Sequence, residues 1–253
     1  MSRPVRLVLV HGSQLSGVQW TRYAALLGPD VEVVVPDLPA HGSRRGEEFR
    51  WEGALAVIGD AVEGGDPAVP VVLAGHSLGG YLAMAWAAEH PTRLAGLALL
   101  GATAVPAGPG AALYRGIARV EARLGVDRMS RALDRQWDSL LPPELAAVLK
   151  EAGYGFDGIP AAWHGVMTRC RPSMLRSVTC PVLLVAGQLD QLRVDRRRFA
   201  RAAESARWVR SVVIRGGLHV FPLTHPNETA AALWELLADA RATTPPTRTE
   251  IDQ

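Results

Sequence analysis

Six short apolar runs, separated by helix-like stretches, set the strongest limit on how this 253-residue chain can fold. Each run is rich in Val and Leu and mostly continuous rather than alternating, which is typical of strands buried on both faces of a sheet. Alternating strands and helices predict an α/β fold with a six-stranded, mostly parallel, doubly wound sheet. The runs lie at residues 5–10, 31–42, 70–75, 94–101, 180–187 and 208–216.

The segments between these runs have the spacing of helices that bury one face. Right-handed crossovers would place such helices on both faces of the sheet. The carboxyl ends of the strands then meet at one edge, where open α/β sheets bind their ligands. We predict helices at residues 16–27, 51–62, 77–89, 193–204 and 226–240.

Residues 104–176 interrupt the alternation with helical segments and no clear strand. An insertion at the carboxyl end of a strand would lie over the predicted site as a cap. We therefore predict an α/β core formed by residues 1–103 and 177–240, a helical cap at 104–176 and a flexible tail at 241–253. Within the cap, helices are expected at roughly 110–124, 127–141, 143–151 and 160–171.

Composition narrows the partners and the compartment. The net charge of +2 gives no general field that would attract nucleic acid. No run approaches the roughly 18 apolar residues of a membrane span, and the six-residue run near the start is too short for the core of a signal peptide. Cys170 and Cys180 cannot form a disulfide framework and are interpreted as reduced thiols of a reducing compartment, with a single bridge between them as the alternative. We expect a cytoplasmic protein that binds neither nucleic acid nor membrane.

Cofactor and metal sites are also not expected. No group of His, Cys and Asp has the spacing of metal ligands. The segment "GHSLGG" lacks the glycine pattern that opens a phosphate-binding helix.

Three predicted strand ends carry a serine, an acid and a histidine. Ser77 lies in "GHSLGG" after the third run, Asp190 ends "GQLD" after the fifth, and His219 ends "GGLH" after the sixth. A serine hydroxyl becomes a nucleophile when a base takes its proton, and a carboxylate fixes the tautomer of that base. The common edge of the sheet would bring the three side chains together.

Each of these residues has a competing interpretation. Ser77 could be only a helix N-cap, a position that serine favours. His225 is a rival for the base, but it precedes a proline at a helix start and reads as a turn residue. Asp195 is a rival for the acid, but it lies further along, inside a predicted helix. We therefore favour Asp190 and His219.

The chain resembles α/β-hydrolases over nearly its whole length, and the order Ser…Asp…His is that of this family. Only four residues precede the first strand, so the resemblance implies the compact form with a six-stranded core, as in small plant-type esterases and hydroxynitrile lyases. The matching segments are "VLVHGSQLSGVQW", "VVVPDLPAHGSR", "LAGHSLGG", "PVLLVAGQLDQL" and "GGLHVFPLTHPNETAAALWELL".

The resemblance implies a role for each residue. Ser77 would attack the substrate carbonyl, His219 would serve as general base and then acid, and Asp190 would orient His219. Backbone N–H groups of Ser13 and Leu78 would form the oxyanion hole. His76 is expected to point away from the site, in a packing or supporting role.

The expected function is that of a serine hydrolase that cleaves an ester, thioester or lactone through an acyl-enzyme, without a cofactor. One alternative is non-hydrolytic use of the same triad in acyl transfer, cyclisation or hydroxynitrile-lyase-like cleavage. Another is a ligand-sensing receptor on this fold.

The predicted cap offers candidates for recognising the substrate. Five of its side chains are predicted to line an apolar acyl pocket, although any of them could equally form the core of the cap. They are Trp137, Tyr154, Trp163, His164 and Met167.

Two arginine stripes repeat at helical spacing in the same segment. They could bind an acidic partner such as an acyl carrier protein, or a carboxylated substrate. They could also be solvated helix faces that nearby carboxylates partly neutralise. The stripes are Arg115, Arg119 and Arg123, and Arg128, Arg131 and Arg135.

Overall fold

The computed structural model describes residues 3–105 and 125–242. Six strands form one sheet in the order β2-β1-β3-β4-β5-β6, and every neighbouring pair is parallel. This confirms the predicted α/β class and makes the sheet parallel throughout. The strands are β1 (Val5–Val10), β2 (Val31–Val34), β3 (Val71–His76), β4 (Gly96–Leu100), β5 (Val182–Gly187) and β6 (Val209–Ile214).

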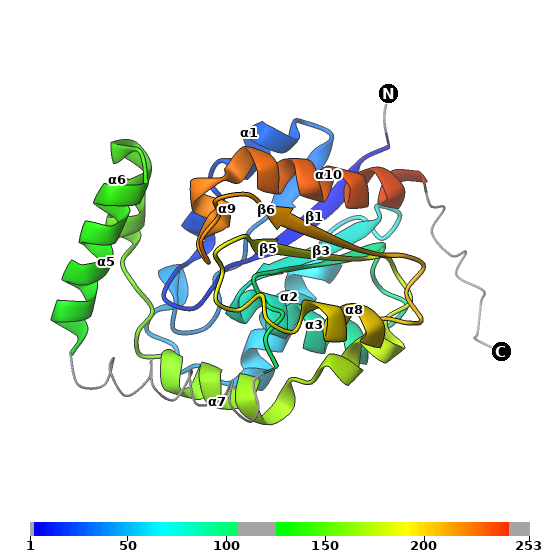
Figure 1. Ribbon diagram of the computed structural model, residues 1–253, viewed down its shortest axis with the longest axis horizontal. Coiled ribbons are helices and arrows are strands. Elements are labelled where there is room, and N and C mark those ends of the chain that lie inside the picture. The colour runs from blue at the N-terminus through cyan, green and yellow to red at the C-terminus, as the bar shows by residue number, and fades with distance from the viewer. Residues whose placement is uncertain (1–2, 106–124, 243–253) are drawn as a thin grey trace.

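Helices cover both faces of the sheet (Figure 1). Successive strand residues point to opposite faces, so Val8 packs with α2 (Trp51–Glu63), α3 (Leu78–Glu89) and α8 (Arg196–Ala202). On the other face, strand residues such as Leu7 pack with α1, α9 and α10, as predicted for a doubly wound sheet. The bounds of these three helices are Tyr23–Leu27, Phe221–Thr224 and Pro226–Ala242.

The single helix predicted at 16–27 is wrong. The chain instead forms a 3-10 turn, η1 (Gly17–Trp20), and then the short helix α1. Two hydrogen bonds fix the turn, because Gly17 N–H donates to Asp37 Oδ1 at 2.7 Å and the buried Gln19 Oε1 accepts from Gly12 N–H at 3.0 Å. These long-range contacts leave no signal in the local apolar spacing.

Three helices of the predicted cap fall within the described residues, and Figure 1 shows them beside and below the sheet. They are α5 (Val126–Leu140), α6 (Pro143–Ala152) and α7 (Ile159–Arg169). Helices α5 and α6 share a small apolar core with Leu15 and Leu223 of the α/β part. The helix expected at 110–124, with Arg115, Arg119 and Arg123, lies outside the described residues. The boundaries of core and cap stay a prediction.

Two smaller observations complete the fold. Helix α10 continues to Ala242, two residues beyond its predicted end, and the rest of the predicted tail lies outside the described residues. None of the helices in the described ranges combines the length and the apolar character that crossing a bilayer requires.

Candidate active site

The turn between β3 and α3 holds Ser77 in a strained conformation. Its φ is 53° and its ψ is −116°, a region that non-glycine residues rarely adopt. The Ser77 N–H donates to the Leu100 carbonyl at 2.8 Å, which ties the turn to β4. A sharp turn from strand to helix presents the serine hydroxyl at the carboxyl edge of the sheet.

Glycines make this turn sterically possible. A Cβ on Gly75 would overlap the Gly79 carbonyl, and a Cβ on Gly79 would overlap the carbonyl oxygens of Val10 and His11. Strand β3, the start of α3 and the end of β1 therefore approach more closely than any side chain would allow.

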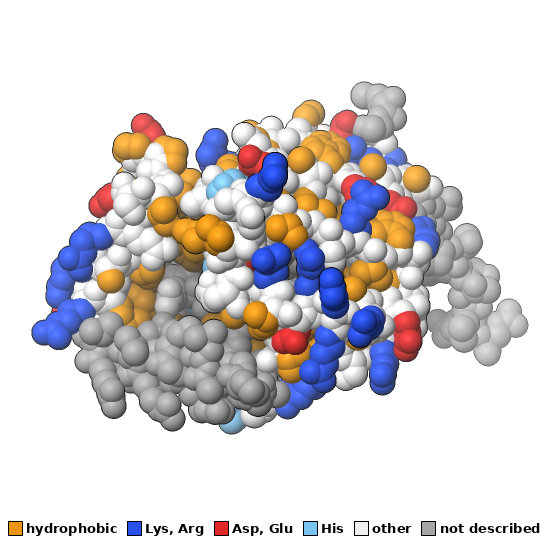
Figure 2. Space-filling model, viewed as in Figure 1, with side chains coloured by type: hydrophobic (Ala, Val, Ile, Leu, Met, Phe, Trp, Pro, Cys, Tyr) orange, Lys and Arg blue, Asp and Glu red, His pale blue; other side chains and the backbone are white. Residues whose placement is uncertain are grey.

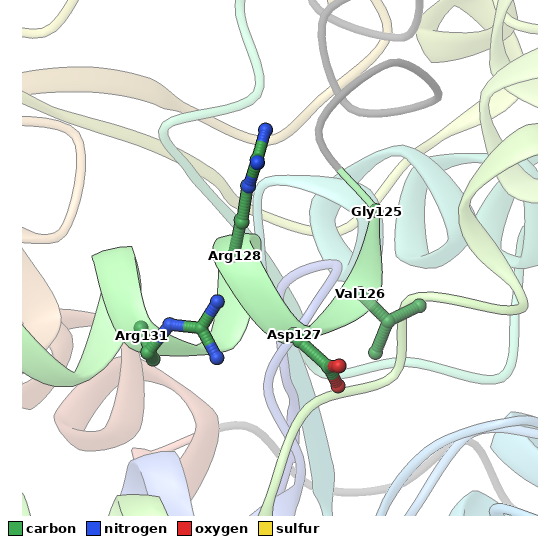
Figure 3. A pocket seen from close by; sticks show the side chains of 5 residues that line it. All are labelled: Gly125, Val126, Asp127, Arg128 and Arg131. Carbon is green, nitrogen blue, oxygen red and sulfur yellow. The ribbon is translucent and has the colours of Figure 1, made fainter.

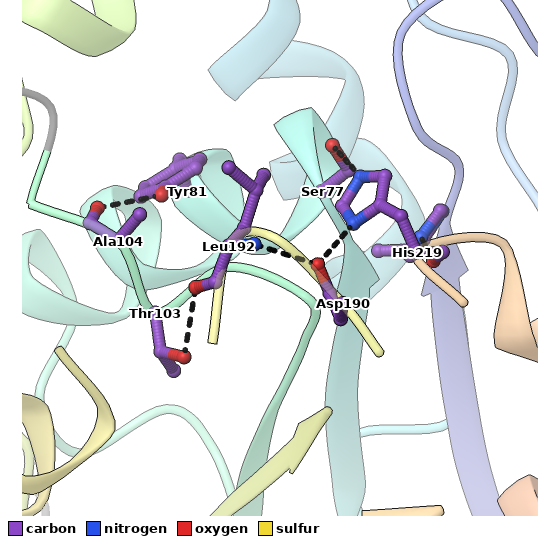
Figure 4. A network of polar contacts seen from close by, with 8 residues as sticks. Ser77, Tyr81, Thr103, Ala104, Asp190, Leu192 and His219 are labelled. Carbon is purple, nitrogen blue, oxygen red and sulfur yellow. Dashed lines mark hydrogen bonds and ion pairs between the residues drawn. The ribbon is translucent and has the colours of Figure 1, made fainter. Parts of the chain in front are cut away.

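The structure brings Ser77, His219 and Asp190 together (Figure 4). The Ser77 hydroxyl lies 3.0 Å from His219 Nε2, and His219 Nδ1 lies 2.9 Å from Asp190 Oδ1. Because a carboxylate accepts only, we assign the ring proton to Nδ1, which leaves Nε2 free to accept from the serine. The three side chains form one continuous hydrogen-bonded chain.

Asp190 is held as an anion. Burial alone would raise the pKa of its carboxyl group. The hydrogen bond and charge of His219, together with the Leu192 N–H at 2.8 Å from Oδ1, outweigh burial and keep the pKa below its usual value. The carboxylate is therefore ionised at neutral pH, beside the ring that it would support.

The acid loop is fastened to the segment after β4, as Figure 4 also shows. Thr103 Oγ1 donates to the Leu192 carbonyl of that loop at 3.3 Å. The segment after β4 is in turn tied to α3, because the Tyr81 hydroxyl donates to the Ala104 carbonyl at 2.7 Å.

Asp195, the rival acid, precedes α8 rather than lying inside it, and its Oδ2 accepts from Val105 N–H at 2.8 Å.

His225, the rival for the base, forms its hydrogen bonds with residues outside the site. His225 Nδ1 lies 2.8 Å from Thr224 Oγ1, and the His225 carbonyl accepts from the Thr229 hydroxyl at the start of α10. The ring of His225 makes no hydrogen bond with Ser77, so the geometry favours His219.

The predicted oxyanion donors are the backbone N–H groups of Ser13 and Leu78. Leu78 opens α3, and Ser13 follows β1 in the loop that faces Ser77 across the same cavity. Within the described residues, neither N–H donates to another protein group. Both donors are therefore available to a ligand.

The loop that carries Ser13 is held by His11. Its Nδ1–H donates to the Gly12 carbonyl at 2.8 Å, and its Nε2 accepts from Leu38 N–H at 3.0 Å. Burial, and then the neighbouring ring of His41, lowers the pKa of His11 to about 3. A neutral ring is required for this donor and acceptor pair, because a charged imidazole donates from both nitrogens.

His76 differs from the expectation that it points away from the site. Its ring centroid lies 5.0 Å from that of His219, and its Nε2–H donates to the His219 carbonyl at 2.9 Å. Burial and then the charge of His219 lower the pKa of His76 to about 3, so the ring stays neutral. The supporting role is thus exerted on the backbone of His219.

A cavity of about 360 Å³ opens over Ser77 and His219. Apolar side chains and three carboxamides line it, and no Asp, Glu, Lys or Arg belongs to the part of the lining that the structure describes. The carboxamides Gln14, Gln136 and Gln191 were not anticipated, since a lone Gln carries no sequence signal. The apolar lining is Leu15, Leu133, Trp137, Trp163, Leu192, Leu218 and Val220.

Two of the five predicted pocket residues, Trp137 and Trp163, line this cavity. The other three do not. Tyr154 turns its hydroxyl to Asp134 Oδ1 at 2.6 Å, His164 is exposed on α7, and Met167 packs in a small cluster beside Trp163. Helical spacing alone does not say which face of a cap helix meets the core.

A second hollow, of about 290 Å³, lies at the start of α5 (Figure 3). Arg128 and Arg131 project from the helix there, beside Asp127. Arg135 continues the stripe one turn on, and all three arginines are exposed. Figure 2 shows basic side chains on the outer face over α5 and a second group over α8.

Within the residues that the structure describes, no group of three or more His, Cys, Asp or Glu side chains is arranged to hold a metal ion.

Comparison with known proteins assigns the family. The model of the alpha/beta hydrolase family matches residues 7–232. The chain belongs to the α/β-hydrolase family. Pimeloyl-[acyl-carrier protein] methyl ester esterase of Chromobacterium violaceum is 24% identical to this α/β-hydrolase over 254 residues, which cover 91% of this chain and 93% of that protein.

Two further relatives have related activities. Lipase LipV of Mycobacterium tuberculosis is 38% identical over 104 residues, which cover 39% of this chain and only 38% of the lipase. A thermophilic esterase from Thermogutta terrifontis has a TM-score of 0.72 at 25% identity, covering 96% of this chain and 92% of the esterase. This α/β-hydrolase is therefore an enzyme, and ester hydrolysis is its general class.

Proposed function

We propose that this enzyme cleaves carboxylic esters through an acyl-enzyme formed on Ser77. The observation that carries the proposal is the hydrogen-bonded chain from the Ser77 hydroxyl through His219 to Asp190 at the floor of the cavity. Thioesters and lactones present the same carbonyl chemistry and belong to the same proposal.

The geometry supports the following steps. His219 Nε2 takes the hydroxyl proton as Ser77 Oγ bonds to the substrate carbonyl carbon, and the carbonyl oxygen becomes an anion. The N–H groups of Ser13 and Leu78 stabilise that anion, each by about 3 kcal/mol. The protonated His219, supported by ionised Asp190, then gives its proton to the leaving alkoxide. Water repeats the sequence on the acyl-enzyme and frees Ser77.

The cavity favours an uncharged acyl group. Its described lining has no charged side chain to pair with a substrate carboxylate, and burying an unpaired charge is costly. Gln136 and Gln191 can hydrogen-bond to a polar but neutral group on the acyl chain.

The test of the nucleophile is a fluorophosphonate that reacts with activated serines. Mass spectrometry of the digested wild-type enzyme is expected to find the adduct on Ser77, and Ser77→Ala should remain unlabelled. Ser177→Ala, which changes an exposed serine far from the cavity, is the matched control and should be labelled like the wild type. Absence of labelling, or labelling that persists in Ser77→Ala, would remove the nucleophile assignment.

A carrier-linked substrate is a second, more specific candidate. The relatives include esterases named for a pimeloyl-[acyl-carrier protein] methyl ester, and carrier proteins are commonly acidic. On α5, Arg128, Arg131 and Arg135 are exposed, and none forms an ion pair with a described residue. We propose that this stripe contacts the carrier while the acyl group enters the cavity.

Charge reversal separates this candidate from free-ester hydrolysis. Changing the three α5 arginines to Glu should raise KM at least tenfold for a methyl ester carried on acyl carrier protein, and leave KM for the free methyl ester unchanged. The matched control reverses three exposed arginines of α8, Arg197, Arg198 and Arg201. Equal losses in both triple variants would contradict docking on α5. A panel of free esters, thioesters and lactones, with acyl acceptors other than water, distinguishes hydrolysis from acyl transfer.

A further inference from the structure

Backbone strain in the described residues gathers around the site. Apart from glycines, three residues there have a positive φ: Ser77 at 53°, Gln14 at 69° and Ala40 at 68°. Such conformations persist where the surrounding structure holds them, and they concentrate at functional sites. The turn at the nucleophile explains Ser77. Gln14 and Ala40 require a separate explanation.

Gln14 directly follows Ser13, whose N–H is the proposed oxyanion donor. Its backbone pairs with Gly155, in the segment between α6 and α7, as an isolated antiparallel bridge. The Gly155 N–H donates to the Gln14 carbonyl at 3.3 Å. A residue of the predicted cap is thus hydrogen-bonded to the loop that presents the donor.

The segment between α6 and α7, residues 155–158, packs against Ala40 and His41. The His41 ring is buried, and its Nδ1 lies 2.8 Å from the Pro39 carbonyl, which fixes its orientation. A Cβ on Gly155 would overlap this ring, and a Cβ on Gly158 would come within 3.0 Å of Ala40 Cβ. The segment lies flat on residues 40 and 41 because its glycines carry no side chains.

The two ends of the oxyanion loop are therefore held differently. Gly12 is fixed from within the α/β part, since its carbonyl accepts from His11 and its N–H donates to Gln19. Beyond Ser13, the carbonyl of Gln14 is held by Gly155.

We propose that Gly155 is a positioning residue for the oxyanion hole. The His11 bond to the Gly12 carbonyl orients the Gly12–Ser13 peptide, and the 155–158 segment, by holding the Gln14 carbonyl, fixes the loop on the other side of Ser13; together they keep the Ser13 N–H in place for the developing oxyanion. The proposal rests on the function proposed above, because it assumes that Ser13 is a donor in the reaction. The rate of the chemical step then depends on how the 155–158 segment packs on residues 40 and 41 more strongly than ground-state binding in the cavity does.

The test is Gly155→Ala, which forces the segment away from His41. We expect kcat to fall about 100-fold, within the range for loss of one oxyanion donor, with less than a twofold change in KM. The affinity for an alkyl trifluoromethyl ketone, whose adduct with Ser77 places an oxyanion at the same position, should fall by a similar factor. A merely structural role would lower stability without this split between kcat and KM.

Two controls keep the test specific. In His41→Ala the ring is absent and a Cβ on residue 155 has room, so adding Gly155→Ala to that variant should change kcat less than threefold. Gly53→Ala, on α2, is the matched substitution, since its Cβ would meet no atom closer than 3.9 Å. It should keep wild-type kinetics.

The possible failures can be told apart. If the wild type neither takes the phosphonate on Ser77 nor hydrolyses esters, the proposed function fails. If the wild type is active but Gly155→Ala keeps its kcat and its affinity for the ketone, the positioning proposal alone fails. An equal loss of kcat with and without the His41 ring also contradicts it, because the steric cause would be absent.

Discussion

The two histidines beside the site predict a steep loss of stability in mild acid. His11 and His76 are buried, and burial lowers the pKa of each to about 3. In the unfolded chain a histidine has a pKa of about 6.5. Between these values the unfolded chain binds protons that the folded protein does not, so stability is present above pH 6.5 and falls as the pH drops toward 3.

The magnitude follows from the unfolded pKa, because at pH 5 both folded rings are still neutral. Each histidine favours unfolding by about 2 kcal/mol at pH 5 relative to pH 7.5, or about 4 kcal/mol for the pair. His41, whose pKa burial also lowers, acts in the same direction. A loss of this size is a large part of the roughly 5–15 kcal/mol that stabilises a typical domain.

Urea unfolding followed by tryptophan fluorescence at pH 7.5 and pH 5.0 measures the loss. His76→Gln keeps a donor for the His219 carbonyl but does not titrate, so it should lose about 2 kcal/mol less than the wild type. His164→Gln, which changes an exposed ring on α7, is the control and should lose as much as the wild type. The reasoning is refuted if the wild type loses less than 1 kcal/mol, or if His76→Gln loses as much as the wild type.

Three further substitutions test the site. Asp190→Asn should lower kcat roughly 10⁴-fold on p-nitrophenyl esters, because the amide no longer holds the His219 tautomer; a loss below tenfold would contradict the assignment. Gly79→Ala should lower the free energy of unfolding by about 1–3 kcal/mol in urea, since its Cβ overlaps the carbonyls of Val10 and His11; unchanged stability would show that the turn at Ser77 tolerates a side chain there. Trp163→Ala should raise the preference for a dodecanoyl over a butyryl ester roughly tenfold in kcat/KM, and an unchanged ratio would place Trp163 outside the acyl site.

The sheet was predictable because its four inner strands, β1, β3, β4 and β5, are buried along almost their whole length. The segment 5–10 is apolar except for Arg6, whose guanidinium reaches Glu32 and the Ala61 carbonyl at the sheet's end, and it forms β1 within the predicted bounds. The meeting of Ser77, Asp190 and His219 followed from the same rule, since parallel strands end at one edge. Both the strands and the residues at their ends can be recognised from short, local stretches of the sequence.

The contacts that the sequence did not reveal join residues far apart in the chain. Gln14 meets Gly155 through backbone atoms alone, and no side-chain pattern records that pairing. His76 could not be oriented from its position beside Ser77, because the partner of its ring is a carbonyl 143 residues away. The sequence does not show that the Tyr154 hydroxyl bonds to Asp134, 20 residues away, which holds this side chain outside the predicted pocket.

The place of β6 in the sheet has a consequence for how activity is lost. β6 is an edge strand that pairs only with β5, and most of its residues are at least partly exposed. Edges with few buried contacts open at a lower free energy than the interior of a sheet. The loop after β6 carries His219, whereas Ser77 follows β3, which lies between β1 and β4 in the interior of the sheet. Fraying of this one edge is expected to move His219, the proposed base, away from Ser77, so that activity is lost while most of the fold stays intact.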